Sequence, residues 1–365
     1  MAQQSSFRVT LRPSGREFTV EGDETILAAA LRAGVGLPYG CKNGACGTCK
    51  CKVLDGQWTQ GTHSASALNA DEQAKGGILV CTSRPQTDVV IEARELSGFG
   101  DIPIRKMPCR IAKIERPVDD VAIVSLQLPA NERLQYRAGQ YVEFILKDGA
   151  RRSYSIATAP HADEQVQLHI RHMPGGVFTD LLFGARSGQG TPALKERDIL
   201  RLEGPLGTFF LREDNPRPIV LLASGTGFAP IKAIAEHIFH KRLNRDEGDR
   251  PARPVLLYWG CRAKKDLYLD ALPRQWAAEQ PNFSYVPVLS DATPEDAWSG
   301  RTGFVHRAVM QDLPDLSGHQ VYACGAPIMV DSARRDFVAK CGLPEDQFFA
   351  DAFTSQADLA DAPKS

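Results

Sequence analysis

Residues 37–53, LPYGCKNGACGTCKCKV, contain the spacing that decides the fold of the first domain. Cys41, Cys46 and Cys49 are spaced C-x4-C-x2-C, and Cys81 follows after 31 further residues. One tight loop with this spacing can supply three thiolates to a binuclear [2Fe-2S] cluster, and a distant cysteine can supply the fourth. We therefore expect Cys41, Cys46, Cys49 and Cys81 to be the ligands of such a cluster.

Glycine in this loop permits positive φ angles and lets backbone N–H groups approach the sulfurs. The three glycines are Gly40, Gly44 and Gly47. A zinc site is the alternative, but zinc sites usually pair two C-x2-C segments, and only one is present here. Cys51 is interpreted as a small buried residue of the outgoing strand KCKVL, not as a ligand. Three other cysteines receive the same interpretation: Cys109, Cys261 and Cys341.

The composition excludes several classes of function. The chain has 365 residues, enough for two or three domains. Lysine plus arginine number 43 and aspartate plus glutamate 44, so the net charge of −1 offers no basic excess for binding nucleic acid. No apolar run approaches the ~20 residues of a membrane span, so we expect no membrane association and a cytoplasmic location. The nine cysteines are then not expected to form disulfides, and nothing indicates the oligomeric state.

Local patterning divides the chain into blocks. Residues 1–95 begin with two alternating runs, FRVTL and REFTV, followed by an apolar helical stretch at 26–33. Residues 96–108 are interpreted as a linker, because they contain glycine and proline without periodicity. The polar tail, 354–365, is expected to be disordered.

The two remaining blocks have different patterns. Residues 109–214 contain short apolar runs, such as VAIVSLQL and QVQLHIR, separated by turn residues, which predicts an antiparallel β-barrel. In residues 215–353, apolar runs such as PIVLLA and QVYACG alternate with helical stretches. This alternation predicts a doubly wound parallel sheet that binds a nucleotide. The expected fold class is a multidomain combination of α+β and α/β.

The cysteine loop resembles that of β-grasp ferredoxins. The chain as a whole resembles reductases in which a ferredoxin domain precedes a ferredoxin-reductase-like pair of domains, as in benzoate-dioxygenase-type and phenol-hydroxylase-type reductases. The resemblance covers about residues 7–353 and rests on separate motifs in the family's order. It implies a β-grasp [2Fe-2S] domain, an FAD-binding β-barrel domain and an NAD(P)H-binding domain.

Residues 152–155 match the family's R-x-Y-S motif as Arg152, Ser153, Tyr154 and Ser155. The resemblance implies that Arg152 pairs with the pyrophosphate of FAD, a bidentate task that suits arginine. It also implies that Tyr154 packs against the flavin. Ser155 would hydrogen-bond near the flavin N5, which makes it a candidate catalytic residue. The alternative is an ordinary strand with an exposed arginine.

A second flavin motif is IRHMPGGVFT at 170–179, a strand followed by a glycine turn and a helix start. Gly175 and Gly176 would let N–H groups at the helix start approach phosphate oxygens. The family has a basic residue near Arg171 and a hydroxyl residue at Thr179, and the two motifs together favour FAD over FMN. The candidate FAD-binding residues of this segment are Ile170, Arg171, Gly175, Gly176, Val177 and Thr179. No role is assigned to His169 or His172.

A nicotinamide motif begins at 223–230, ASGTGFAP, which follows an apolar strand and opens a helix. This is the context of a phosphate-binding loop. Pro230 replaces the third glycine of the dinucleotide fingerprint; ferredoxin-reductase-like domains show this variant, and proline is tolerated in a first helical turn. The candidate residues are Gly225, Thr226, Gly227 and Pro230.

The next strand ends at 258–262, YWGCR, where the adenosine ribose is expected. The candidate residues here are Gly260 and Arg262. Arg262 with Lys264 and Lys265 could hold the 2′-phosphate of NADPH, whereas Asp266 could contact the free 2′-hydroxyl of NADH. A solvated charged loop is the third interpretation. The resemblance favours NADH, with NADPH as the alternative.

Cys324 and Gly325 begin CGAP, which ends a later strand and matches a family motif. The resemblance implies that Cys324 lies beside the nicotinamide C4 during hydride transfer, and a buried strand cysteine is the alternative. Residues 348–353, FFADAF, resemble the family's C-terminal segment. The last aromatic of that segment, here Phe353, would cover the flavin until nicotinamide displaces it.

Three redox sites in one chain predict a relay. Nicotinamide gives up two electrons as hydride, a [2Fe-2S] cluster accepts one at a time, and flavin can do both. The expected protein is an NAD(P)H-dependent electron-transfer reductase that passes hydride to FAD and single electrons through the cluster to a partner protein.

The resemblance implies two classes of acceptor for this relay, and both remain open. One is a pyridoxamine-phosphate-dependent dehydrase that handles a CDP-sugar, and the other is the oxygenase component of an aromatic-ring dioxygenase or multicomponent monooxygenase. A non-catalytic redox sensor is the alternative of another class, and the intact Cys324 and Gly225 loop speak against it.

Overall fold

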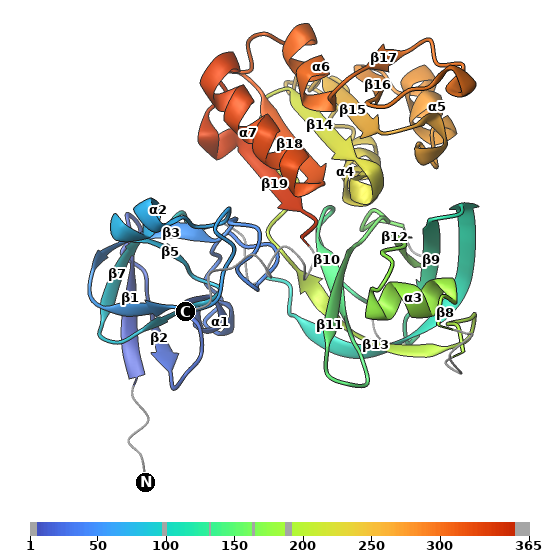
Figure 1. Cartoon of the computed structure of the whole chain (residues 1–365). Coiled ribbons are helices and arrows are strands. Elements are labelled where there is room, and N and C mark those ends of the chain that lie inside the picture. Colours follow the sequence, from blue (N-terminus) through green and yellow to red (C-terminus); the bar gives the residue numbers. More distant parts are fainter. Residues whose placement is uncertain (1–5, 97–100, 131–132, 163–164, 187–191, 355–365) are drawn as a thin grey trace. The chain divides into compact units, whose positions relative to one another are not determined.

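The computed structural model describes residues 6–96, 101–130, 133–162, 165–186 and 192–354. They form two compact units, which divide between residues 103 and 104 and again between 352 and 353 (Figure 1). The polar tail predicted at 354–365 lies outside the described residues, apart from Thr354.

The first unit is built on a five-stranded sheet in the order β2-β1-β7-β3-β5. Strand β1 pairs antiparallel with β2 and parallel with β7, and β3 pairs antiparallel with β5 and β7. The strands are β1 (Ser6–Arg12), β2 (Glu17–Glu21), β3 (Lys50–Asp55), β5 (Gly77–Leu79) and β7 (Val89–Glu92). A separate two-stranded ribbon contains β4 (Trp58–Gln60) and β6 (Ser83–Pro85).

Two short helices accompany this sheet, α1 (Ile26–Arg32) and α2 (Ala70–Ala74). Helix α1 begins where the side chain of Thr25 accepts a hydrogen bond from the N–H of Ala28, which satisfies one of the free donors of the first turn. Its apolar face packs against alternate buried residues of β1 to form the core of this unit. The strands and the helix expected from FRVTL, REFTV and residues 26–33 are confirmed, and the mixed sheet is the predicted β-grasp fold.

The second unit begins with an antiparallel sheet in the order β11-β10-β13-β8-β9-β12. A bridge between Ile156 and Leu168 joins the two edges, so the sheet closes as the predicted barrel. Helix α3 (Val177–Phe183) covers it with Phe178 and Leu182 in the shared core. The strands are β8 (Arg105–Val118), β9 (Val121–Gln127), β10 (Tyr141–Ile145), β11 (Arg151–Ser155), β12 (Val166–Arg171) and β13 (Ile199–Leu206).

Strand β8 begins at Arg105, inside the stretch 96–108 that the sequence suggests is a linker. Its first residues pair with β13, Arg105 opposite Gly204 and Pro108 opposite Arg201. The pairing partner lies about a hundred residues away, which is why local periodicity does not reveal this part of the strand.

The rest of the second unit is a six-stranded parallel sheet in the order β17-β16-β15-β14-β18-β19. The strands are β14 (Ile219–Ser224), β15 (Val255–Cys261), β16 (Phe283–Leu289), β17 (Arg301–Thr302), β18 (Gln320–Gly325) and β19 (Phe348–Ala352). The helices are α4 (Phe228–His240), α5 (Ala271–Glu279), α6 (Val305–Asp312) and α7 (Pro327–Cys341). All the strand pairs are parallel, as the alternation of apolar runs and helices predicts.

Successive residues of β14 face opposite sides of this sheet. Ile219 and Leu221 belong to the core shared with α4 and α5, whereas Val220 and Leu222 belong to the core shared with α6 and α7. The sheet is therefore covered on both faces, which is the doubly wound arrangement. Its carboxyl ends meet at one edge, where such folds bind ligands.

Among the residues that the structure describes, no helix is both long and apolar enough to cross a membrane.

Candidate functional site

The cysteine loop lies between α1 and β3, and Cys81 follows β5. The N–H of Cys41 donates to Sγ of Cys46 over 3.4 Å, and the N–H of Cys46 donates to Sγ of Cys41 over 3.3 Å. The Sγ atoms of Cys49 and Cys81 are 3.2 Å apart, and both residues are buried. The four predicted ligands thus come together as two pairs.

Glycine is required where the loop turns. Gly44 has φ of +84°, and a Cβ there would lie 2.6 Å from the carbonyl oxygen of Thr62. Gly47 has φ of +72°, with the carbonyl oxygen of Ala67 3.3 Å from the position of a Cβ. These two positions let the backbone curl tightly enough for its N–H groups to reach the sulfurs.

The two thiols of each pair perturb one another's pKa. The hydrogen bond from Cys46 lowers the pKa of Cys41 to about 7, and the same bond with burial raises the pKa of Cys46 well above its usual value. In the other pair, the hydrogen bond with Cys81 and burial raise the pKa of Cys49. Four neighbouring thiolates can coexist only if positive charge lies between them, which iron supplies.

The arrangement fits two irons better than one zinc ion. Two thiol pairs match a binuclear cluster with two thiolates per iron. All nine cysteines are free, and burial alone raises the pKa of Cys51 to about 12. The buried positions of Cys109, Cys261 and Cys341 agree with the interpretation of these residues as core.

The predicted flavin strand is β11. Arg151 pairs with Glu143 over 2.9 Å and also with Glu203, so this arginine holds the barrel together. Arg152 donates to the carbonyl oxygen of Arg151 over 2.7 Å, and the structure shows no carboxylate partner for it among the described residues. Its guanidinium therefore remains a suitable partner for a diphosphate. Ser153 donates to Glu143 over 3.2 Å.

The ring of Tyr154 lies over the barrel core, with centroids 5.8 Å from Phe144 and 5.4 Å from Phe178. The next residue, Ser155, is buried, and its Oγ donates to Oδ2 of Asp351 over 3.4 Å. Asp351 lies in β19 opposite Cys324 of β18. Three polar groups from distant parts of the chain therefore meet where the barrel contacts the parallel sheet.

Cys324 is fully buried beside Asp351. Burial, assisted by the charge of Asp351, raises the pKa of Cys324 well above its usual value, so the thiol stays protonated. A neutral, compact side chain at the carboxyl end of β18 suits contact with an uncharged ring.

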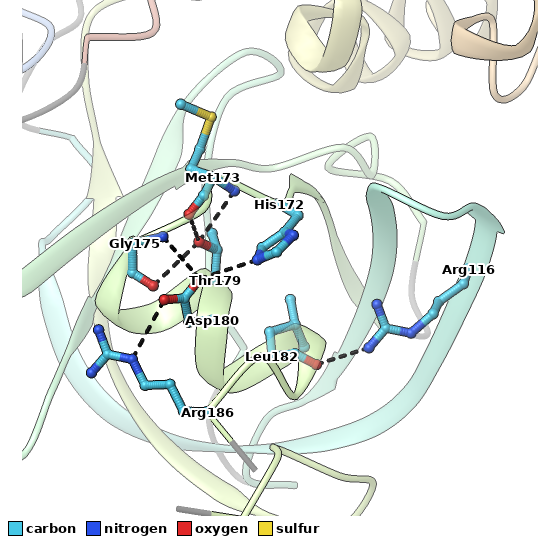
Figure 2. Close-up of polar contacts among 9 residues, drawn as sticks. Arg116, His172, Met173, Gly175, Thr179, Asp180, Leu182 and Arg186 are labelled. Atoms are coloured by element: carbon cyan, nitrogen blue, oxygen red, sulfur yellow. Dashed lines mark hydrogen bonds and ion pairs between the residues drawn. The ribbon is translucent and has the colours of Figure 1, made fainter. Parts of the chain in front are cut away.

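The second predicted flavin segment connects β12 to α3 (Figure 2). Thr179 is buried, and its hydroxyl donates to the carbonyl oxygen of Met173 over 2.9 Å. The N–H of Gly175 donates to Asp180 and that of Gly176 to Met173, so both predicted phosphate donors bond within the loop. The side chain of Ile170 is in the barrel core, and Val177 is the first residue of α3.

The predicted nicotinamide loop is a 3-10 turn, Gly225–Gly227, between β14 and α4. A Cβ on Gly227 would lie 2.2 Å from the carbonyl oxygen of Cys324, and a Cβ on Gly325 would lie 2.1 Å from Oγ of Ser224. The two strand ends thus pack backbone to backbone. Thr226 is buried in the turn, and Pro230 lies in the first turn of α4. This geometry fits a loop that receives a dinucleotide at close range.

Arg171, predicted as a flavin contact, lies next to the Gly225–Gly227 turn, and its contact with FAD stays a prediction. Its NH1 is 3.3 Å from the position of a Cβ on Gly225, and its NH2 is 3.6 Å from Oδ1 of Asp266. Asp120 of the barrel lies 3.0 Å from its Nε. The guanidinium therefore faces the loop that follows β14.

Two further hydrogen bonds fasten the barrel to the parallel sheet. Lys232 of α4 donates to the carbonyl oxygen of Ala157 over 3.2 Å, directly after the R-x-Y-S strand. Buried His169 of β12 lies 2.8 Å from the hydroxyl of Tyr268. Burial and the charge of Lys232 lower the pKa of His169 to about 3, so the imidazole is neutral. These contacts hold the two candidate nucleotide sites close together.

At the end of β15, a Cβ on Gly260 would lie 2.7 Å from the side chain of Val305, so this position too is closely packed. Arg262 is exposed, as are Lys264 and Lys265. Asp266 accepts the N–H of Ala263 over 3.1 Å and faces Arg171, so its carboxylate caps the turn. The preference for NADH over NADPH stays a prediction.

Phe353 directly follows β19, and its side chain is 37% exposed. Phe353 belongs to the first of the two compact units. The predicted position of its ring over the flavin stays a prediction. Asp351, two residues earlier, is the site residue that sequence reasoning missed. An acidic residue within the otherwise apolar strand FFADA was the available signal.

Family models match the chain in three consecutive segments that together cover most of its length. They describe a 2Fe-2S iron-sulfur cluster binding domain at residues 9–86, an oxidoreductase FAD-binding domain at 108–211 and an oxidoreductase NAD-binding domain at 221–335. The chain therefore belongs to the family of ferredoxin-fused NAD(P)H oxidoreductases, electron-transfer flavoproteins with a [2Fe-2S] cluster and FAD.

Individual relatives share this organisation over almost their full length. The CDP-6-deoxy-L-threo-D-glycero-4-hexulose-3-dehydrase reductase of Yersinia pseudotuberculosis is 42% identical, covering 95% of this chain and 98% of its own. Reductase component 1 of terephthalate 1,2-dioxygenase from Comamonas is 32% identical, covering 95% and 97%. The crystal structure of the Amycolatopsis cytochrome P450 reductase GcoB superposes with a TM-score of 0.74 at 34% identity, covering 96% and 99%.

Proposed function

We propose that this chain accepts hydride from NADH where β11, β18 and β19 meet, and delivers electrons through its four-cysteine site to a dehydrase that acts on a CDP-sugar. The observation that carries the choice of acceptor is the greater similarity to a reductase named for such a dehydrase, 42%, than to a dioxygenase reductase component, 32%. In the sequence, the proposed order of the domains is the [2Fe-2S] domain at 1–95, the FAD domain at 109–214 and the NAD(P)H domain at 215–353.

The residues of the second unit have separate tasks in this proposal. FAD, when bound, accepts a hydride and releases its electrons one at a time. Arg152 neutralises diphosphate charge, and Tyr154 gives the ring an apolar surface. Ser155 presents a hydroxyl whose orientation is held by Asp351, and Cys324 closes the nicotinamide side without adding charge. Positioning of two rings at close range is the contribution that the chain can make to hydride transfer.

Replacement of Ser155 with alanine is expected to slow reduction of the flavin by NADH. The substitution removes the hydroxyl that bonds to Asp351, and loss of one positioned hydrogen-bonding group at a reacting centre typically costs about 100- to 1000-fold. Anaerobic stopped-flow mixing with NADH measures the rate directly. Ser125→Ala, which removes a buried hydroxyl from β9 of the same barrel, is the matched control and is expected to react at the wild-type rate. Equal rates for the two variants would remove Ser155 from the site.

The choice of acceptor is tested by reconstitution. The purified chain is mixed with NADH, a pyridoxamine-phosphate-dependent CDP-6-deoxy-hexulose dehydrase and its sugar substrate. We expect NADH consumption that requires both the dehydrase and the sugar. A parallel mixture contains the oxygenase component of an aromatic-ring dioxygenase and its substrate, where consumption is expected to remain at the level of uncoupled oxidation. Faster, substrate-dependent consumption with the oxygenase would contradict the proposal and favour the second acceptor class.

A further inference from the structure

We propose that Asp180 is a positioning residue for FAD, because its buried carboxylate holds the loop at 172–176 in one shape. The inference rests on the proposed binding of FAD by this chain and on the predicted contact of the segment 170–179 with its phosphates. Asp180 is not among the residues that carry the family motif. It lies in α3, directly after Thr179.

The carboxylate of Asp180 ties three parts of the segment together (Figure 2). Its Oδ1 accepts the N–H of Gly175 over 3.2 Å and lies 3.1 Å from Nε2 of His172. Its Oδ2 accepts Nε–H of Arg186 over 3.5 Å. The side chain is only 10% exposed, so these groups provide the hydrogen bonds that water would otherwise supply.

The bonding partners keep Asp180 charged and compensate that charge. Burial by itself raises the pKa of Asp180, but the hydrogen bonds from His172, Arg186 and the N–H of Gly175 outweigh it, and the pKa is lowered overall. Arg186 supplies a full positive charge beside the carboxylate. An anionic ligand can therefore approach the loop without meeting an uncompensated carboxylate.

His172 is itself fixed by the far end of α3. Its ring stacks on Phe183 with centroids 4.8 Å apart and an angle of 17°. The guanidinium of Arg116 lies 4.2 Å from the centre of the same Phe183 ring and donates to the carbonyl oxygen of Leu182 over 2.8 Å. The packing of the His172 ring on Phe183 therefore holds the imidazole in the orientation that bonds to Asp180.

Thr179 and Asp180 fasten two different points of the same loop. Thr179 bonds to Met173, and Asp180 bonds to Gly175 two residues later. At Gly175 φ is +84° and nothing lies within 4 Å of the position of a Cβ, so the loop turns at an open face. The N–H of Gly175 is already bonded to Asp180. Asp180 therefore decides which backbone groups remain for a ligand, and a loop shaped in advance binds with less loss of entropy.

The test measures FAD affinity by titrating flavin-free protein with FAD and following the quenching of flavin fluorescence. Asp180→Ala is expected to raise the dissociation constant about tenfold or more, the size expected for losing hydrogen bonds to a charged group. Asp180→Asn keeps an acceptor for Gly175 and is expected to restore most of the affinity. Asp148→Ala is the matched control, since this exposed barrel aspartate also accepts a backbone N–H, from Ala150 over 2.9 Å.

Two further variants separate the possible failures. His172→Phe keeps a ring on Phe183 but removes the donor to Asp180, so it tests the network even if Asp180→Ala does not fold; weaker FAD binding than wild type is expected. Gly176→Ala places a Cβ 2.5 Å from the hydroxyl of Thr179 and disturbs the loop directly. If Gly176→Ala weakens FAD binding while Asp180→Ala and His172→Phe do not, the role of Asp180 is overturned alone. If none of the variants Asp180→Ala, His172→Phe and Gly176→Ala changes the affinity for FAD, both the role of Asp180 and the assignment of the loop to FAD are wrong.

Discussion

Replacement of Cys46 with serine is expected to abolish reduction of cytochrome c by NADH while sparing reduction of ferricyanide. Cys46 and Cys41 form one of the two thiol pairs, and each sulfur accepts the N–H of the other residue. A serine hydroxyl is a harder and far less acidic ligand than a thiol, so the pair can no longer hold iron as two thiolates. Ferricyanide is a small oxidant that can take electrons from the flavin directly, without the cluster.

The control for this variant lies in the outgoing strand. Cys51→Ser changes the same atom five residues later, in β3, at a cysteine whose raised pKa reflects burial alone. We expect this variant to retain the cluster spectrum and both activities. Two results would contradict the electron route: unchanged reduction of both oxidants by Cys46→Ser, or protein that is colourless and carries zinc at these cysteines after growth with sufficient iron.

Replacement of Gly227 with alanine is expected to weaken the binding of NADH strongly while leaving FAD and the cluster in place. The added Cβ would lie 2.2 Å from the carbonyl oxygen and 2.5 Å from the carbonyl carbon of Cys324, and both are backbone atoms that cannot rotate away. The Gly225–Gly227 turn and the end of β18 must then move apart. Overpacking of this kind costs about 1–3 kcal/mol, which corresponds to roughly a 5- to 150-fold loss of affinity if it is expressed at this site.

The measurement is the KM for NADH together with the rate of flavin reduction at saturating NADH. Gly318→Ala is the matched control, because a Cβ at this glycine of the same parallel-sheet region meets nothing within 4 Å. The visible spectra of both variants should show the full flavin and cluster content. A KM for Gly227→Ala equal to that of Gly318→Ala would show that the turn does not receive the nicotinamide dinucleotide.

The fold classes were predictable because each depends on local repetition. Alternating runs predicted the strands of the first unit, and the change to apolar runs separated by helices predicted the parallel sheet; the structure confirms both. The start of β8 was not predictable, since residues from Arg105 become a strand through pairing with β13. Pairing partners far along the chain override a segment's own pattern of glycine and proline.

The candidate site shows the same division between local and distant information. Motif spacing singled out Ser155 and Cys324, but Asp351 is 196 residues from the serine to which it bonds. Arg171 belongs to a flavin motif by its neighbours in sequence, yet its guanidinium faces Gly225 of the parallel-sheet region. Only the packing of the barrel against that sheet decides which of these side chains meet.

The sequence by itself determined which functional side chains and backbone turns lie within one short loop. The spacing of Cys41, Cys46 and Cys49 defines one loop, and the glycines of the other motifs mark backbone turns whose geometry depends on a few adjacent residues. The tertiary structure decided the distant partners: Asp351 for Ser155, and Cys81 for Cys49. Hydrogen bonds form over about 3 Å, and only the complete packing of sheets and helices brings distant residues within that range.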